Sequence, residues 1–283
     1  MAAIFLFLWI GGPVAPQEGG DNSRIAFSDA TRFASFRPEK ITPPSGWFWS
    51  HDIQTSQIET TATPGYRIQR LSVYGAGRHR RFAGFFEPGM PARRYAVDLT
   101  SDMIKKQNPG LNPVSLCVDA SLPEPGFSAV LEPDPTNESV IQVDLNEKQL
   151  HALVSEQRRI TDLVVYSKAG ARRYAVIVRT MKAIAGKQEP WFLFTNLSQA
   201  ELAMQLQRSK ARLLRLRRHT EKGEVRFHGI AVPAGKTKST WYASIDADSL
   251  AEALERENSY LIDLDAFNNG AGLRFTAVMI RSD

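Results

Sequence analysis

Few residues in this chain of 283 have both the type and the spacing needed for catalysis. Neither a His-Glu-x-x-His motif nor a Cys/His metal spacing occurs among the five histidines, which are His51, His79, His151, His219 and His228. Ser50, His51 and Asp52 are adjacent, and neighbours on a strand point to opposite faces, which is poor geometry for a triad. We therefore expect no catalytic residue, metal ligand or cofactor site, and enzymatic activity stays an open question.

Cys117 is the only cysteine, so the chain has no internal disulfide. It lies in Val114-Ser115-Leu116-Cys117-Val118, whose alternation is typical of a strand. Nothing nearby in the sequence would lower the pKa of its thiol. We expect Cys117 to be a small buried hydrophobe and not a reactive nucleophile.

The strongest charge feature is the basic stretch from Arg208 to His219. If it forms a strand, alternation places Arg215 and Arg217 together on one face, which predicts a short exposed cationic strip. Such a strip could contact phosphates or an acidic polymer. A simple solvated strand face is the alternative, because no aromatic side chains accompany the arginines. The candidate contacts to an anionic ligand are Arg212, Arg215, Arg217 and Arg218.

An acidic or amide residue also recurs along the chain, at Asp52, Asp98, Asp144, Asn196 and Asp246. These side chains could form a ring that binds cations or basic peptides. The competing interpretation is structural: each precedes an expected helix start, where a negative charge offsets the helix dipole by about 0.3 to 1 kcal/mol.

These residues belong to a repeating unit. An aromatic residue, preceded in most copies by arginine, recurs at intervals between 45 and 53 residues, a period typical of repeat proteins. The recurring aromatics are Phe33, Phe82, Phe127, Tyr174, Phe227 and Phe275.

Short helices are predicted upstream of the last five aromatics. Their expected N-caps lie two residues after each acidic position, at Gln54, Thr100, Asn146, Ser198 and Asp248. An apolar residue precedes each cap, and another follows four residues after it in four units, which is the pattern of a hydrophobic staple. In the last unit Glu252 occupies that second position and breaks the pattern.

A strand rich in aromatic and β-branched residues precedes each helix, and a hairpin follows it. We therefore expect an α+β fold of five strand-helix-strand-strand units with antiparallel sheets, at about residues 45–87, 88–132, 135–179, 188–233 and 239–281. Residues 24–38 resemble the closing hairpin of a further half unit. Residues 21–283 would form a single repeat domain, either a ring with a propeller-like arrangement or an open solenoid.

Three segments of the first unit carry a family resemblance: Gly65-Tyr66-Arg67-Ile68, Leu71-Ser72-Val73-Tyr74-Gly75 and Arg81-Phe82-Ala83. They resemble the tandem repeat in the N-terminal region of polyglycine hydrolases and of related bacterial tandem-repeat proteins. In that family the repeat region precedes a serine hydrolase domain of the β-lactamase kind. The resemblance therefore implies an accessory or recognition module, and no functional residues carry over.

The hydrolase motifs themselves do not occur here. No serine is followed three residues later by lysine, and Gly235-Lys236-Thr237-Lys238 lacks the final glycine of Lys-Thr-Gly.

The N-terminal residues 1–20 hold a short apolar run, Ile4 to Ile10, of the length of a signal-peptide core but without a basic n-region. We expect export, to the periplasm or outside the cell, and no membrane span. The net charge of +5 is too small to select an acidic partner.

From the residues and the resemblance together, we expect a non-catalytic, monomeric module that recognises a protein, a peptide or a glycan. The alternatives are an enzyme, either a hydrolase remnant or a new site at the repeat hub, and binding of nucleic acid or another anionic polymer through residues 208–228. We expect a protein, a peptide or a glycan as the partner rather than nucleic acid.

Overall fold

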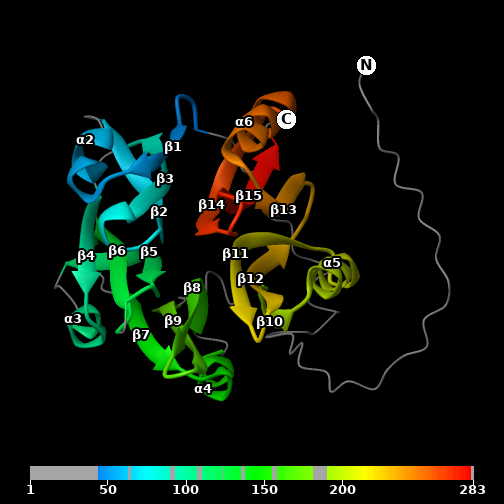
Figure 1. Ribbon diagram of the computed structural model, residues 1–283. Coiled ribbons are helices and arrows are strands. Elements are labelled where there is room, and N and C mark those ends of the chain that lie inside the picture. Colours follow the sequence, from blue (N-terminus) through cyan, green and yellow to red (C-terminus); the bar gives the residue numbers. More distant parts are fainter. Residues whose placement is uncertain are drawn as a thin grey trace.

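The computed structural model describes residues 44–62, 65–89, 93–106, 110–122, 124–134, 138–154, 158–180 and 190–281. Its elements repeat five times in the order strand, helix, strand, strand, as the sequence predicts (Figure 1). The expected half unit at 24–38, with Phe33, and the segment 1–20 lie outside the described residues.

Unit 1 contains β1 (Phe48–Ile53), the 3-10 turn η1 (Thr55–Gln57), α2 (Ile58–Thr61), β2 (Tyr66–Tyr74), the 3-10 turn η2 (Gly77–His79) and β3 (Arg81–Pro88). Unit 2 contains β4 (Arg94–Leu99), α3 (Ser101–Lys105), β5 (Leu111–Asp119) and β6 (Gly126–Pro133). Unit 3 contains β7 (Ser139–Leu145), α4 (Glu147–Ala152), β8 (Arg158–Lys168) and β9 (Ala171–Thr180).

Unit 4 contains β10 (Phe192–Leu197), α5 (Gln199–Arg208), β11 (Ala211–Glu221) and β12 (Glu224–Pro233). Unit 5 contains β13 (Ser239–Ile245), α6 (Ala247–Arg256), β14 (Ser259–Asn268) and β15 (Leu273–Arg281). The helix of unit 1 is the shortest because Thr60, Thr61 and Pro64 are poor helix formers, as the sequence indicates.

Each unit folds into its own three-stranded antiparallel sheet, in which the last strand lies between the first two. The recurring aromatic begins the pairing of the last strand with the first, opposite the apolar residue that precedes the helix cap. The pairs are Ile53–Phe82, Leu99–Phe127, Leu145–Tyr174, Leu197–Phe227 and Ile245–Phe275. All five aromatics are buried, so the repeated phrase is a packing signature.

The predicted cap of the last helix is wrong by two residues. Asp246 is the N-cap of α6, and its side chain accepts a hydrogen bond from the Ser249 N–H. The residue before the cap is then Ile245, and four residues after it comes Leu250, which is fully buried. With this register the apolar staple is present in all five units, and Glu252 no longer breaks the pattern.

The recurring acidic residues of the first four units have a different role from capping. Asp52, Asp98, Asp144 and Asn196 have φ between 57° and 62°, in the left-handed region that Asn and Asp tolerate best among residues other than glycine. In each unit this residue lies in the irregularity between the first and last strands. The recurrence therefore reflects a backbone requirement at a bulge two residues before the cap.

The second strand of each unit lies toward the middle of the molecule (Figure 1). We call β2, β5, β8, β11 and β14 the inner strands. Each contacts the inner strand of the next unit, and β14 of unit 5 contacts β2 of unit 1. These contacts are made by side chains, because the hydrogen-bonded ladders stay within single units.

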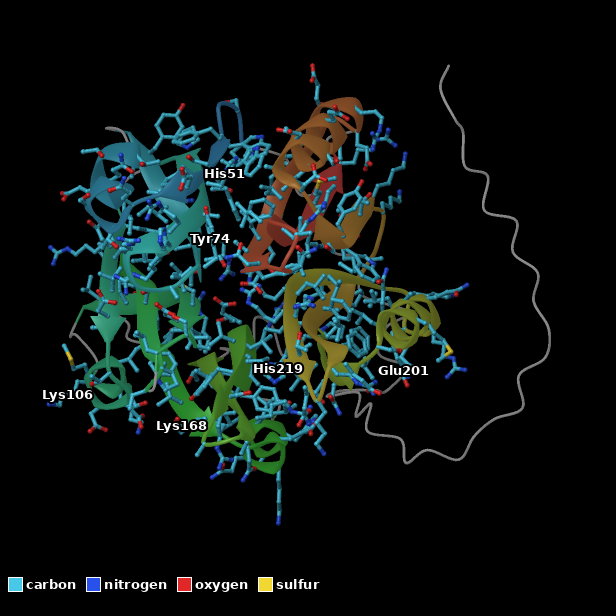
Figure 2. The ribbon with its side chains drawn as sticks, viewed as in Figure 1. His51, Tyr74, Lys106, Lys168, Glu201 and His219 are labelled. Atoms are coloured by element: carbon cyan, nitrogen blue, oxygen red, sulfur yellow. The ribbon has the colours of Figure 1, made fainter. Side chains whose placement is uncertain are left out.

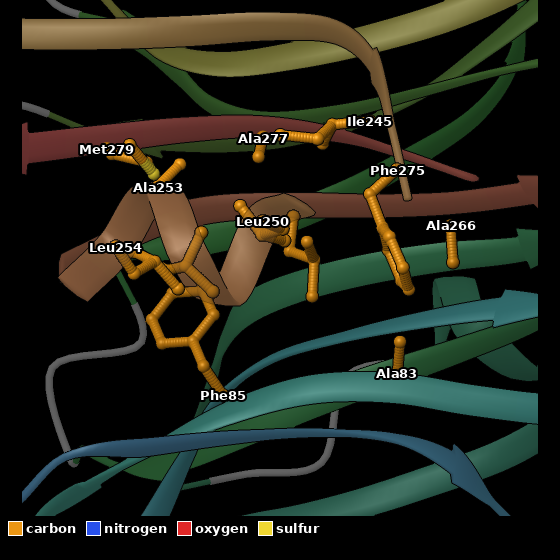
Figure 3. Packing of buried hydrophobic residues seen from close by; sticks show 12 residues of the cluster. Ala83, Phe85, Ile245, Leu250, Ala253, Leu254, Ala266, Phe275, Ala277 and Met279 are labelled. Atoms are coloured by element: carbon orange, nitrogen blue, oxygen red, sulfur yellow. The ribbon is translucent and has the colours of Figure 1, made fainter. Parts of the chain in front are cut away.

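The hydrophobic cores extend from each unit into a neighbouring one. Each of the five clusters of buried side chains contains residues of two neighbouring units. One cluster joins the ends of the described repeats: Ala83 and Phe85 of unit 1 pack with Leu250 and Leu254 of unit 5 (Figure 3). Trp49 adds an edge-on ring contact with Phe275 at 5.8 Å between centroids.

Candidate functional site

A bulge in every inner strand decides which side chains reach the middle of the molecule. The pairing with the last strand shifts by one residue at Gln69, Val114, Thr161, Leu214 and Ile262. An extra residue at the same place in five strands turns the following side chains in the same way. Those side chains are Arg70, Ser115, Asp162, Arg215 and Asp263.

Arg70, Asp162 and Asp263 build a buried ionic cluster at the centre together with Arg217, two residues after Arg215 on the same strand. Arg70 Nη1 donates to Asp162, and Arg217 Nη1 donates to Asp263 Oδ2 at 2.6 Å. The second Nη atom of Arg217 donates to Asp162 Oδ1 at 3.1 Å, so Asp162 joins units 1, 3 and 4. Burial opposes the charge on Arg217, but Asp263 and Asp162 outweigh it and raise its pKa.

Backbone N–H groups also donate hydrogen bonds to the two carboxylates. The Leu116 N–H donates to Asp162 Oδ2 at 2.8 Å, and the Leu216 N–H donates to Asp263 Oδ2 at 2.7 Å. Leu116 and Leu216 each come two residues after the bulge of their own strand. At such a bulge the hydrogen bonding to the paired strand is interrupted, which frees a backbone N–H for another acceptor. The carboxylates therefore connect inner strands that share no ladder.

The predicted exposed cationic strip on β11 is wrong. Arg212 and Arg217 are 6% and 5% exposed, and Arg217 belongs to the buried cluster. Arg215 lies beside Asp162 at 3.7 Å, and Arg218 lies over the Phe267 ring at 4.5 Å. Arg215 and Arg217 share a face, as alternation predicts, but that face is turned inward because β11 is an inner strand.

Above this cluster lies a pocket of about 620 Å³. It is lined by the C-terminal ends of all five inner strands and by the turns that follow them. On each inner strand, the lining residue nearest the middle of the strand is Ser72, Cys117, Val164, Arg217 or Asp265, one from each unit. We call these five residues the floor of this central pocket. In Figure 2, Tyr74 and His219, both of which line this pocket, lie in the middle of the molecule, whereas Lys106 and Glu201 lie at its periphery.

The wall of this central pocket combines rings with polar groups. Asp119 is 6% exposed, and its Oδ1 accepts hydrogen bonds from the N–H and the hydroxyl of Ser121. The nearest cation to its Oδ2 is Arg80, at 3.9 Å. Burial lowers the pKa of His219, so its imidazole is neutral at pH 7 and can both donate and accept a hydrogen bond. The pocket therefore suits a ligand with an apolar body and polar edges.

The floor holds two potential nucleophiles, the hydroxyl of Ser72 and the thiol of Cys117, and neither is activated. The Ser72 hydroxyl donates to Asp265 Oδ1 at 2.9 Å and accepts from the Ala266 N–H at 2.8 Å. Cys117 is buried, as the sequence predicts, and burial raises the pKa of its thiol to about 12. A thiol with such a pKa is a poor nucleophile at neutral pH.

His219 on β11 and His228 on β12 lie across the hairpin from each other, with ring centroids 6.5 Å apart. His228 is fully buried on β12, and its Nδ1 accepts the Asn196 N–H at 3.2 Å. His51 packs against Trp49 and Phe275. Within the described ranges, no three His, Cys, Asp or Glu side chains gather as a candidate metal site.

None of the recurring acidic residues lines the central pocket in the described part of the chain, so the arrangement does not support the alternative of a ring of carboxylates around its mouth. They form separate ion pairs instead, such as Arg81–Asp52 at 3.0 Å and Arg274–Asp246 at 2.8 Å. Asp98 and Asp144 line a different, smaller depression together with Lys168. Asp98 of unit 2 also pairs with Arg80 of unit 1, so these ion pairs form both within units and between neighbouring units.

The sequence reasoning did not identify Arg70, Asp162 and Asp263. A signal was present: Asp162 stands in Thr161-Asp162-Leu163-Val164-Val165, and Asp263 stands in Ile262-Asp263-Leu264. A lone carboxylate inside an apolar strand is buried with a partner or solvated at an edge. The sequence alone does not show which arginine on another strand is that partner.

The first unit carries the link to known proteins, because its helix, inner strand and last strand have the repeat geometry described above. Residues 56–89 match the family of polyglycine hydrolase-like structural repeats. This repeat match confirms the resemblance that the sequence of unit 1 shows. No protein of curated function matches the chain. In the described part of the chain, no helix has the length and apolar character needed to cross a membrane.

Proposed function

We propose that this chain is a non-catalytic recognition module that holds a short segment of a peptide or a glycan in the central pocket. The observation that carries the proposal is the composition of that pocket, which takes one strand end from each of the five units. Function in repeat proteins commonly lies on the surface that all repeats share. The five units would then form a closed ring, since contacts return from β14 to β2.

The lining supports recognition better than nucleophilic catalysis. Ser72 and Cys117 are engaged or protonated, while Tyr74, Phe267 and His219 offer ring surfaces beside polar atoms. Such a mixture suits sugar rings and peptide groups. The repeat match supports a position next to a hydrolase domain that would act on the bound polymer, and export would bring the module to such a substrate.

The test is a binding screen of peptide and glycan arrays with the full chain and two tryptophan variants. Ala120 is exposed at the pocket wall, so Ala120→Trp narrows the pocket. Ala251 is exposed on α6 and does not line the pocket, so Ala251→Trp is the matched control. We expect Ala120→Trp to abolish binding and Ala251→Trp to retain it.

A ligand that binds both variants equally would place recognition elsewhere on the surface. Covalent labelling of the unmodified chain by an active-site serine probe would favour the enzyme alternative and overturn the proposal.

A further inference from the structure

A second, smaller pocket of about 270 Å³ lies toward the N-terminal ends of the inner strands. Three arginines line it, Arg70, Arg93 and Arg215, together with Gln69, Glu87 and Tyr260. This pocket therefore has three cationic side chains and one carboxylate in its wall. It is separate from the central pocket, with which it shares no residue.

The guanidinium group of Arg93 is held by hydrogen bonds from its two Nη atoms, which leave its Nε–H without an acceptor. Its Nη1 donates to Ile68 O and to the Gln69 side chain, and its Nη2 donates to Glu132 at 2.9 Å. Only 10% of this side chain is exposed, and its Nε has no hydrogen-bond partner among the described residues. A buried guanidinium N–H without a partner is costly, which marks the position as a site for an acceptor.

Arg215 shows the same incomplete pairing. Its Nη1 donates to the carbonyl oxygens of Leu214 and Ile262, at 2.6 and 3.2 Å. Its Nε lies 3.7 Å from Asp162 Oδ1 and has no hydrogen-bond partner in the described part of the chain. Asp162 accepts its hydrogen bonds from Arg70 and Arg217, so it balances the charge of Arg215 only in part.

One carboxylate lines the pocket, and Glu87 accepts a hydrogen bond there from the Gln69 amide. Glu132 and Asp162, which pair with Arg93 and Arg70, do not belong to the lining. The donors that line the pocket are planar guanidinium groups. Guanidinium groups match carboxylate and phosphate oxygens, with which they form charge-assisted hydrogen bonds.

We propose that this arginine pocket binds a small oxyanion, a carboxylate or a phosphate, through Arg93 and Arg215. The proposal goes beyond recognition in the central pocket and uses a different set of residues. It gives Arg215 an anion-binding role in a recessed pocket instead of on an exposed strip.

The test is a titration of the full chain with inorganic phosphate and, separately, with acetate, at constant ionic strength set by chloride. Isothermal calorimetry and thermal unfolding are the readouts. We expect saturable binding of at least one anion in the unmodified chain. Arg215→Gln and Arg93→Gln should each weaken it about tenfold or more, since each removes a charged donor.

The matched control is Arg226→Gln on β12, because Arg226 is an arginine outside the pocket and pairs with Glu224. It should bind the anion like the unmodified chain, as should Ala120→Trp, which separates this proposal from the one on the central pocket. Circular dichroism checks that each variant is folded. If Arg215→Gln does not fold, Arg93→Gln decides.

Phosphate and acetate distinguish the two ligand chemistries, and either result supports an oxyanion site. Stabilisation that never saturates, or that Arg226→Gln loses as much as Arg93→Gln does, would show a general salt effect and overturn the proposal. Absence of binding by both anions would overturn it too.

Discussion

Arg217 and Asp263 form a hydrogen-bonded ion pair at the centre of the molecule, with side chains only 5% and 1% exposed. They lie on the inner strands of units 4 and 5, and Arg217 reaches Asp162 of unit 3 with its other Nη atom. Arg217 therefore joins three units that are connected in sequence only through the segments after β9 and β12.

Removal of one partner of this pair should be strongly destabilising. We expect Asp263→Asn to lower the free energy of unfolding by about 3 to 5 kcal/mol, because it leaves the Arg217 charge buried without its closest partner. Urea unfolding followed by circular dichroism measures this change. Glu224→Gln, which breaks an exposed pair with Arg226, should have a much smaller effect. Equal effects would show that the buried pair contributes no more than a surface pair.

The junction between the first and last units should be as well packed as the others. Phe85→Ala should cost about 3 to 5 kcal/mol, since Phe85 is buried in the cluster that contains Leu250 and Leu254. Hydrogen exchange of the α6 amides should accelerate in this variant, although α6 is far from residue 85 in sequence. Met103→Ala, at a side chain that is 52% exposed, should leave exchange in α6 unchanged. If the exchange rates of the α6 amides were unchanged in Phe85→Ala, the packing of unit 1 against α6 would be contradicted.

The register of the last helix cap can be tested by two substitutions two residues apart. Asp246→Ala should lower the urea midpoint because it removes the acceptor of the Ser249 N–H. Asp248→Ala should lower it less, because Asp248 lies in the first turn and contributes only its charge. A larger decrease for Asp248→Ala than for Asp246→Ala would show that Asp248 is the N-cap, as the sequence pattern predicts.

Acid should destabilise the fold through His228. Burial holds its pKa well below 6.5 in the folded state, so between these two values the unfolded chain binds a proton that the folded chain does not. Stability should therefore fall as pH drops below about 6.5, by at most about 1.4 kcal/mol per pH unit for one group. His219 shifts in the same direction.

Urea unfolding between pH 7.5 and 5 measures this dependence. His228→Gln should make it shallower, whereas His79→Gln, at an exposed residue of η2, should retain it. The same slope in both variants would assign the acid sensitivity to other groups.

The thiol of Cys117 should not react in the folded protein. Burial raises its pKa to about 12, so a disulfide reagent at pH 8 finds neither access nor thiolate. We expect no reaction until urea unfolds the chain and one equivalent afterwards. Rapid labelling without urea would show that the floor of the central pocket opens.

The sequence by itself determines the repeating unit, because its signals are local. Strand alternation, caps such as Ser198 with Glu201, and turns such as Asn268-Asn269-Gly270 depend on residues a few positions apart. Asp246 and Asp248 are both good N-caps, so the repeat pattern alone selects Asp248 for the last helix, and only the pairing of Ile245 with Phe275 selects Asp246.

Tertiary structure decides which face of each inner strand is buried. Alternation places Arg215 and Arg217 together, but only the contacts of β11 with β8 and β14 turn them toward Asp162 and Asp263. Those carboxylates are 46 or more residues away along the chain from Arg217. Local patterns hold no information about such distant partners, so the two pockets, which exist only where several units meet, could not be read from any one repeat.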